Sequence, residues 1–179
     1  MWANGSTKLF DKHLEPTPLG RRLFYLLAVA YILVLIAMCF TPQQLMPQYK
    51  DVMTPGIIQV GRVYLLLIPL NSFVNAGQID TWSNFFLILL QNIANVLLLI
   101  PLVFCCLVLF PKWRSLKKAL LYSFFISLGI EMTQIILDVT IDAGRVFEID
   151  DLWTNSLGGG IAYCIYSTIC KAIFKKERS

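Results

Sequence analysis

Four long apolar segments, separated by polar connections, dominate the pattern of hydrophobic and polar positions along the chain. They cover residues 23–40, 85–110, 119–139 and 153–174. A helix needs about 20 predominantly apolar residues to cross the hydrocarbon core of a bilayer, and each segment is close to that length. The pattern therefore predicts an all-α fold, an integral membrane bundle of four transmembrane helices.

The connection between the first two segments, residues 41–84, holds a further apolar stretch at residues 57–70. This stretch is shorter than a spanning helix and contains Arg62 and Pro69, so it suits the membrane surface better than a full crossing. We expect a short interfacial or re-entrant helix here. The predicted organisation has three parts, namely a tail at 1–22, a transmembrane domain at 23–174 and a second tail at 175–179.

Composition excludes an ordinary soluble domain. Hydrophobic residues make up 57% of the 179 residues and charged residues only 15%, whereas soluble domains carry about 25% charged residues. The five cysteines lie in or beside apolar segments, where cysteine behaves as a small apolar residue. His13 is the only histidine, so we expect neither a histidine metal site nor histidine-based catalysis.

Lysine and arginine are distributed unevenly between the connections. Of the 15 in the chain, twelve lie before the first segment, between the second and third, or at and beyond the end of the fourth. Because positively charged connections stay in the cytoplasm, we predict a multi-pass cell-membrane protein with both termini cytoplasmic. The net charge of +4 follows from this distribution, so we do not expect a nucleic-acid partner.

The third segment carries a polar stripe. Residues three and four apart share one face of a helix, and five polar residues follow this spacing: Ser123, Ser127, Glu131, Gln134 and Asp138. A charged side chain at the bilayer centre costs at least about 2.5–3.5 kcal/mol on insertion scales. We therefore expect the stripe, and Glu131 above all, to face other helices or a wet cavity.

Polar residues of the other segments are expected at a similar depth. Asn92 and Asn95 share a face near the outer end of the second segment, and the fourth begins with Asp150 and Asp151. We predict one polar pocket that opens toward the outer leaflet. Its predicted ligand-binding residues are Asn92, Asn95, Glu131, Gln134, Arg145, Asp150, Asp151 and Asn155.

Each of these residues also has a structural interpretation. One of Asp150 and Asp151 can cap the fourth helix, and the asparagines can join helices by hydrogen bonds. Arg145 can tie down a neighbouring acid or bind a phosphate. No metal or cofactor is expected, although Asp150 and Asp151 are weak candidates for a divalent cation.

Three blocks of the sequence resemble the VanZ-like family over about residues 60–170. They are Asn92-x-x-Asn95 with Pro101, Glu131-x-x-Gln134, and Arg145-x-x-x-x-Asp150-Asp151-Leu152-x-x-Asn155-x-x-Gly158-Gly159. The stretch 66–73 is similar to a further family element, with Leu66 and Leu70 in place of its usual Asn and Phe. The resemblance implies a small bacterial membrane protein with four or five helices. It also implies a link to resistance against teicoplanin and related acylated glycopeptides.

Three functions follow as hypotheses. The first is a binding protein without catalysis, whose outward pocket takes a lipid-linked cell-wall precursor, a membrane lipid or a lipoglycopeptide. The second is an intramembrane enzyme acting on a lipid head group, with Glu131, Asp150 and Asp151 as candidate catalytic residues. The third is a proton-coupled transport component, which needs an oligomer. We favour the first.

Overall fold

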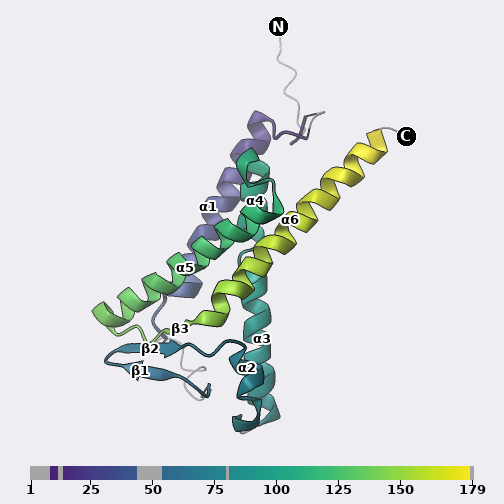
Figure 1. Cartoon of the computed structure of the whole chain (residues 1–179). Coiled ribbons are helices and arrows are strands. Elements are labelled where there is room, and N and C mark those ends of the chain that lie inside the picture. Colours follow the sequence, from purple (N-terminus) through teal and green to yellow (C-terminus); the bar gives the residue numbers. More distant parts are fainter. Residues whose placement is uncertain (1–8, 12–13, 44–53, 80, 178–179) are drawn as a thin grey trace.

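The computed structural model describes residues 9–11, 14–43, 54–79 and 81–177. Parts of the two predicted tails and of the connection 41–84 lie outside the described residues. Long helices form a bundle, and a small sheet lies at one end of it (Figure 1). The beginning of α1 and the end of α6 both lie at the opposite end, apart from each other. Which end faces the cytoplasm stays a prediction from charge.

Five long helices build the bundle: α1 (Pro18–Phe40), α3 (Trp82–Leu98), α4 (Ile100–Leu109), α5 (Leu116–Ile141) and α6 (Ile149–Glu177). Three helical segments among the described residues are long and apolar enough to cross a membrane, namely α1, α3 continued by α4, and α5. Helix α6 has 29 residues, but polar residues and three consecutive glycines dilute its apolar character. A fourth span through α6 therefore stays a prediction.

Side-chain caps explain why three helices begin where they do. The side chains of Thr17, Thr81 and Ser115 accept hydrogen bonds from backbone N–H groups in the first turns of α1, α3 and α5. Such a cap satisfies a donor that has no partner inside the helix. Pro18, which the start of a helix tolerates well, extends α1 beyond the predicted segment 23–40.

The second predicted segment is broken in its middle. Leu99 separates α3 from α4, and Pro101 lies in the first turn of α4. Proline has no N–H and interrupts the hydrogen bonds of a helix. The hydroxyl of Tyr31 in α1 donates a 2.8 Å hydrogen bond to the carbonyl oxygen of Leu98 at this break. The break is thus held by a neighbouring helix.

The prediction of an interfacial or re-entrant helix at 57–70 is wrong. The chain instead forms a hairpin of β1 (Ile58–Val60) and β2 (Val63–Leu66), in which Gly61 takes a φ of +63°. Strand β3 (Val146–Glu148) pairs parallel to β2, so the sheet order is β1-β2-β3. Short, β-branched runs on both sides of a glycine turn favour a hairpin over a helix. The fold is therefore mostly helical and not all-α.

Three short helical turns complete the described structure: α2 (Asn71–Val74), η3 (Ala76–Gln78) and η4 (Pro111–Trp113). Helix α2 follows the hairpin and leads toward α3, whereas η4 lies at the opposite end, between α4 and α5.

Helix α6 is the centre of the bundle, packing against α5, α3 and α4. Two adjacent glycines permit this. A Cβ atom at Gly158 would overlap the carbonyl oxygen of Val96 in α3, and one at Gly159 would overlap the side chain of Ser123 in α5. Small residues let helix backbones approach closely in lipid. These contacts account for both glycines by packing.

We expect Gly158→Ala to lower the melting temperature of the purified protein, because its methyl group must push α3 away. Overpacking of this kind costs about 1–3 kcal/mol, or about 2–4 °C for each kcal/mol in a chain of this size. The matched control is Gly129→Ala in α5, where an added Cβ meets nothing within 4 Å. Equal melting temperatures for the two variants would contradict the close approach.

Candidate functional site

The polar stripe predicted for the third segment is the buried face of α5. Ser123, Ser127, Glu131, Gln134 and Asp138 are all buried in the structure, and Glu131 is only 1% exposed. The apolar residues between them are exposed or only partly buried. Helix α5 thus turns its polar face inward, which is the arrangement expected for a helix surrounded by lipid tails.

Asp151 joins three helices at one point. Its Oδ1 accepts a 2.5 Å hydrogen bond from Nδ2 of Asn95 in α3. Its carboxyl group also lies beside the carboxyl group of Glu131 in α5. The structure therefore brings Asn95, Glu131 and Asp151 together, as the sequence predicts.

Below this junction the polar contacts continue between α5 and α6. Ser127 donates a 3.0 Å hydrogen bond to the carbonyl oxygen of Asp151, and its Oγ accepts one of 2.9 Å from Nδ2 of Asn155. Asn155 is 2% exposed, and its Oδ1 has no hydrogen-bond partner in the described structure. Asn155 thus lies in the interior, where it links the two helices.

Glu148 belongs to this cluster, although it is absent from the predicted site. Its backbone N–H donates a 3.0 Å hydrogen bond to Oε2 of Glu131, and its Oε1 accepts one of 3.1 Å from Nε2 of Gln91. Partial burial, with the nearby charges of Asp151 and Asp150, raises the pKa of Glu148 to about 8. Its position at the end of β3, beside the Asp150-Asp151 pair, is the sequence signal that points to it.

Asp150 holds the segment between the hairpin and α2. Its Oδ1 accepts hydrogen bonds of 2.8 Å from the backbone N–H of Leu70 and from Nε1 of Trp153. Its Oδ2 accepts one of 3.1 Å from the backbone N–H of Asn71. Leu70 has a positive φ of 53°, an uncommon conformation for a non-glycine residue. Asp150 therefore stabilises the start of α2 from its position at the start of α6.

Gln134 and Arg145 contact the end of α1. Nε2 of Gln134 donates to the carbonyl oxygen of Cys39 at 3.0 Å, and Nη2 of Arg145 donates to those of Met38 and Thr41 at 2.8 and 2.5 Å. The last carbonyls of a helix have no partner inside it, and a cation there is favourable. These contacts have a structural explanation, and a ligand-binding role for either residue stays a prediction.

Asn92 lies beside a narrow groove on the other side of α6. Its Nδ2 donates a 2.7 Å hydrogen bond to Oγ of Ser72 in α2. The groove has a volume of about 170 Å³ and an almost entirely apolar surface. Its lining residues are Leu70, Phe73, Leu89, Asn92, Ile93, Val96, Asp150, Trp153 and Thr154. Ser72 and Phe73 lie in the stretch 66–73 that is similar to a family element, but neither they nor Trp153 belong to the predicted ligand-binding residues.

The eight predicted residues thus fall into three neighbouring groups. Asn95, Glu131, Asp151 and Asn155 form the junction of α3, α5 and α6, Asn92 and Asp150 border the groove, and Gln134 and Arg145 hold α1. Among the residues that the structure describes, no group of three or more His, Cys, Asp or Glu side chains is arranged to hold a metal ion.

Comparison with known proteins identifies the family. The family model described as VanZ/LLP1 matches residues 27–172, which include all the helices of the bundle except the ends of α1 and α6. The chain therefore belongs to the VanZ/LLP1 family. No curated protein and no solved structure matches the chain significantly.

The raised pKa of Glu148 predicts a pH-dependent stability. Because the folded protein holds this proton more tightly than the unfolded chain, the stabilising contribution is complete below about pH 4.5 and is lost as pH rises through about 8. Between about pH 5 and pH 9 the melting temperature of the wild type should fall further than that of Glu148→Gln. We expect a difference of about 2–4 °C, allowing for solvent screening of a partly exposed group. Parallel curves for the two proteins would contradict this assignment.

Proposed function

We propose that this VanZ/LLP1 protein binds an acylated or lipid-linked envelope molecule at the end of the bundle that carries the sheet. By this binding it would lower the susceptibility of a bacterium to teicoplanin-class glycopeptides. The observation that carries the proposal is the groove between α2, α3 and α6. It offers an apolar surface with the partly exposed amide of Asn92 at its border, an arrangement that suits an amphiphile.

Different side chains of the groove would contact the two ends of such a ligand. Leu89, Ile93 and Val96 follow one face of α3 at helical spacing, so a hydrocarbon chain would lie along this helix. Asn92 stands beside them and is partly exposed, so its side-chain amide can meet a head group. Trp153 has an amphipathic ring of the type that favours the membrane–water interface. These features support an orientation with the groove in the outer leaflet.

Asp150 gives the groove its shape. The loop residue Leu70 and the α2 residue Phe73 form one wall, and Asp150 holds the backbone of this segment from α6. A wall fixed by buried hydrogen bonds is already in place before a ligand arrives, which lowers the entropic cost of binding. The proposed role of Asp150 is therefore to position the wall.

A variant whose larger side chain fills the groove tests this proposal. Ile93 is 48% exposed and lines the groove. The larger side chain of Ile93→Trp should therefore fill the groove without disturbing the core. The matched control is Leu90→Trp, one turn earlier on α3, at a residue that is 52% exposed and outside the groove lining. We expect a lipoglycopeptide to raise the melting temperature of the wild type and of Leu90→Trp, and to leave Ile93→Trp unchanged.

Three further arms complete the test. An unacylated glycopeptide should cause no shift in any of the proteins, because it has no chain for the groove. Lipid extracted from the host envelope replaces the antibiotic in a second arm, and a shift with this lipid alone would identify an endogenous precursor as the ligand. In cells, the wild type should raise the inhibitory concentration of the lipoglycopeptide severalfold and Ile93→Trp should not. Absence of a thermal shift with either ligand would overturn the proposal.

The carboxyl pair of Glu131 and Asp151 favours a second candidate, chemistry on a lipid head group. Two neighbouring carboxyl groups, one protonated and one ionised, would supply an acid and a base at one place. Asp150 contributes less to this candidate, because its two oxygens already accept three N–H groups. Glu131→Gln separates the two functions, since it should abolish turnover of a lipid but leave binding in the groove intact.

A further inference from the structure

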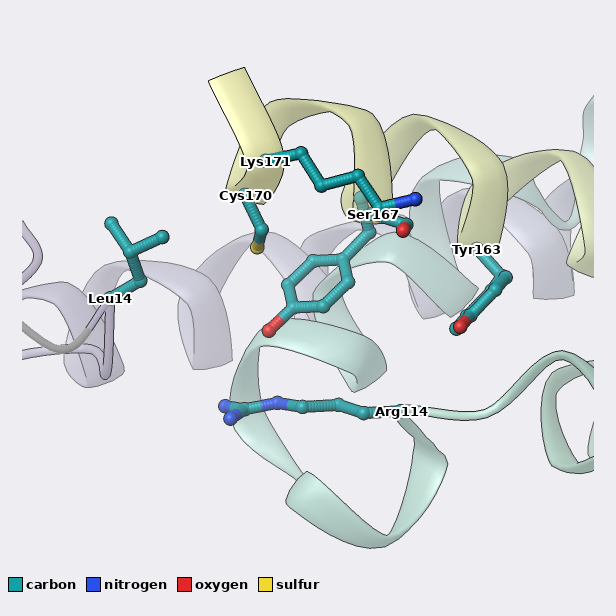
Figure 2. Close-up of a pocket in the computed structure, with 7 residues that line it drawn as sticks. Leu14, Arg114, Tyr163, Ser167, Cys170 and Lys171 are labelled. Carbon is teal, nitrogen blue, oxygen red and sulfur yellow. The ribbon is translucent and has the colours of Figure 1, made fainter. Parts of the chain in front are cut away.

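A second cavity lies at the opposite end of α6 from the carboxyl cluster. It has a volume of about 280 Å³. Its α6 residues begin with Tyr163 and end with Lys171, which places them roughly 18–30 Å from Asp151 along the helix. Across the cavity from them lies Arg114, between α4 and α5 (Figure 2). The lining residues are Leu14, Arg114, Tyr163, Tyr166, Ser167, Cys170 and Lys171.

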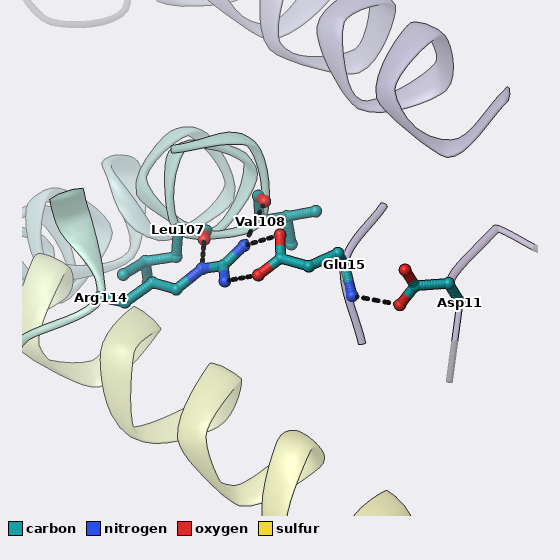
Figure 3. Close-up of polar contacts among 5 residues, drawn as sticks. All are labelled: Asp11, Glu15, Leu107, Val108 and Arg114. Atoms are coloured by element: carbon teal, nitrogen blue, oxygen red, sulfur yellow. Dashed lines mark hydrogen bonds and ion pairs between the residues drawn. The ribbon is translucent and has the colours of Figure 1, made fainter. Parts of the chain in front are cut away.

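Arg114 lines this cavity, and its guanidinium group is held in place by hydrogen bonds. Its Nε and Nη2 each donate a 3.0 Å hydrogen bond, to the carbonyl oxygens of Leu107 and Val108 at the end of α4. Both terminal nitrogens also bind the carboxylate of Glu15, with Nη2 to Oε2 at 2.9 Å (Figure 3). This pairing lowers the pKa of Glu15. A bidentate pair fixes the guanidinium group in one orientation.

Tyr166 in α6 contacts Arg114 within the cavity lining. The guanidinium carbon of Arg114 lies 5.8 Å from the centre of the Tyr166 ring, within the range of a cation–π interaction. Glu15, Arg114 and Tyr166 thus tie the N-terminal segment, the end of α4 and the last third of α6 into one unit. The cavity is formed by parts of the chain that are held in place.

The rest of the lining has an excess of positive charge and hydrogen-bond donors. Glu15 compensates the charge of Arg114, but Lys171 takes part in no ion pair among the described residues. Ser167, Tyr163 and Tyr166 add three hydroxyl groups, and no acidic side chain lines the cavity. Such a lining favours an anion with several acceptor oxygens, and a phosphate group provides them.

We propose that this cavity binds the phosphate-bearing head group of an anionic membrane lipid. Its volume lies just below the roughly 300–1,000 Å³ of typical small-molecule sites, so it suits a head group and not a whole lipid. Ile165, Ile169 and Ile173 form an exposed apolar row on a different face of the same part of α6, with 40%, 45% and 38% of their surface accessible. This row offers a path for the acyl chains. A free phosphate ion would leave it unused.

The position of the cavity also favours a lipid. Lys112, Lys117 and Lys118 are exposed at the same end of the bundle, and basic residues near the ends of membrane helices attract anionic lipids. Basic pockets between such helices are known positions for lipid head groups. The cavity would therefore fix one lipid where the other lysines only attract a diffuse layer.

The test uses the full chain in a zwitterionic detergent, with phosphatidylglycerol as the probe. We expect phosphatidylglycerol to raise the melting temperature of the wild type, and Lys171→Gln to weaken its apparent affinity about fivefold. The control is Lys118→Gln, which removes a charge from the same end outside the cavity and should leave the affinity within twofold. Lys171 and Lys118 are both exposed, so neither variant should alter the stability of the protein without lipid. Ser167→Ala, a second variant in the lining, should also weaken binding.

Every outcome decides the proposal. A selective loss in Lys171→Gln and Ser167→Ala supports it. Equal losses in Lys171→Gln and Lys118→Gln would show diffuse attraction and overturn it, as would a wild type that does not respond. Inorganic phosphate and glycerol 3-phosphate form separate arms, and a shift as large with these as with the lipid would replace the lipid site by a site for small phosphates. The result is independent of the groove proposed above, because the two sites share no residue.

Discussion

The burial of the Glu131 carboxyl group in the middle of α5 is the constraint on which the rest of the structure depends. Burying an acid away from water costs several kcal/mol unless it finds hydrogen-bond partners. The backbone N–H of Glu148 donates a hydrogen bond to Glu131, and the carboxyl group of Asp151 lies beside it. Both come from the segment where β3 passes into α6. The position of α6 against α5 is therefore tied to the satisfaction of this one acid.

The same segment organises the end of the bundle around it. Asp150 fixes the backbone at Leu70 and Asn71, and Arg145 fixes the end of α1. Strand β3 pairs with β2 in the register that sets Leu66 opposite Glu148. Residues 145–151 thus connect the hairpin, α1 and α6, so the wall of the proposed groove and the carboxyl cluster have a common support. At the other end, Arg114 and Glu15 give a comparable tie between α4 and the N-terminal segment.

The sequence predicts the helices and the polar junction well, because both depend on short-range periodicity. Ser123, Ser127 and Glu131 share a helical face whatever surrounds them, and their cost in lipid allows only an inward orientation. The hairpin at 58–66 escapes prediction because its strands have only three and four residues, which periodicity alone cannot distinguish from a helical segment.

Contacts between residues that are distant in the sequence also cannot be predicted from it. Nothing near Asp150 indicates that its carboxylate binds the backbone of Leu70, 80 residues earlier, and nothing near Arg145 points to the end of α1. Such contacts follow from how the helices pack, which the spacing of polar residues does not specify. The cavity at Arg114 is hidden for the same reason, since Glu15 lies 99 residues away.

A double-mutant cycle between Asn95 and Asp151 tests most directly whether polar groups of separate helices meet at one point. The free energies of unfolding of Asn95→Ala, Asp151→Ala and the double variant would be measured in mixed micelles against the wild type. Residues in contact show coupling energies of about 0.5–3 kcal/mol, whereas independent sites add within about 0.3–0.5 kcal/mol. Coupling in the first range is the result that a shared junction requires. Simple additivity would mean that α3 and α6 do not meet through these side chains, and the junction would have to be abandoned.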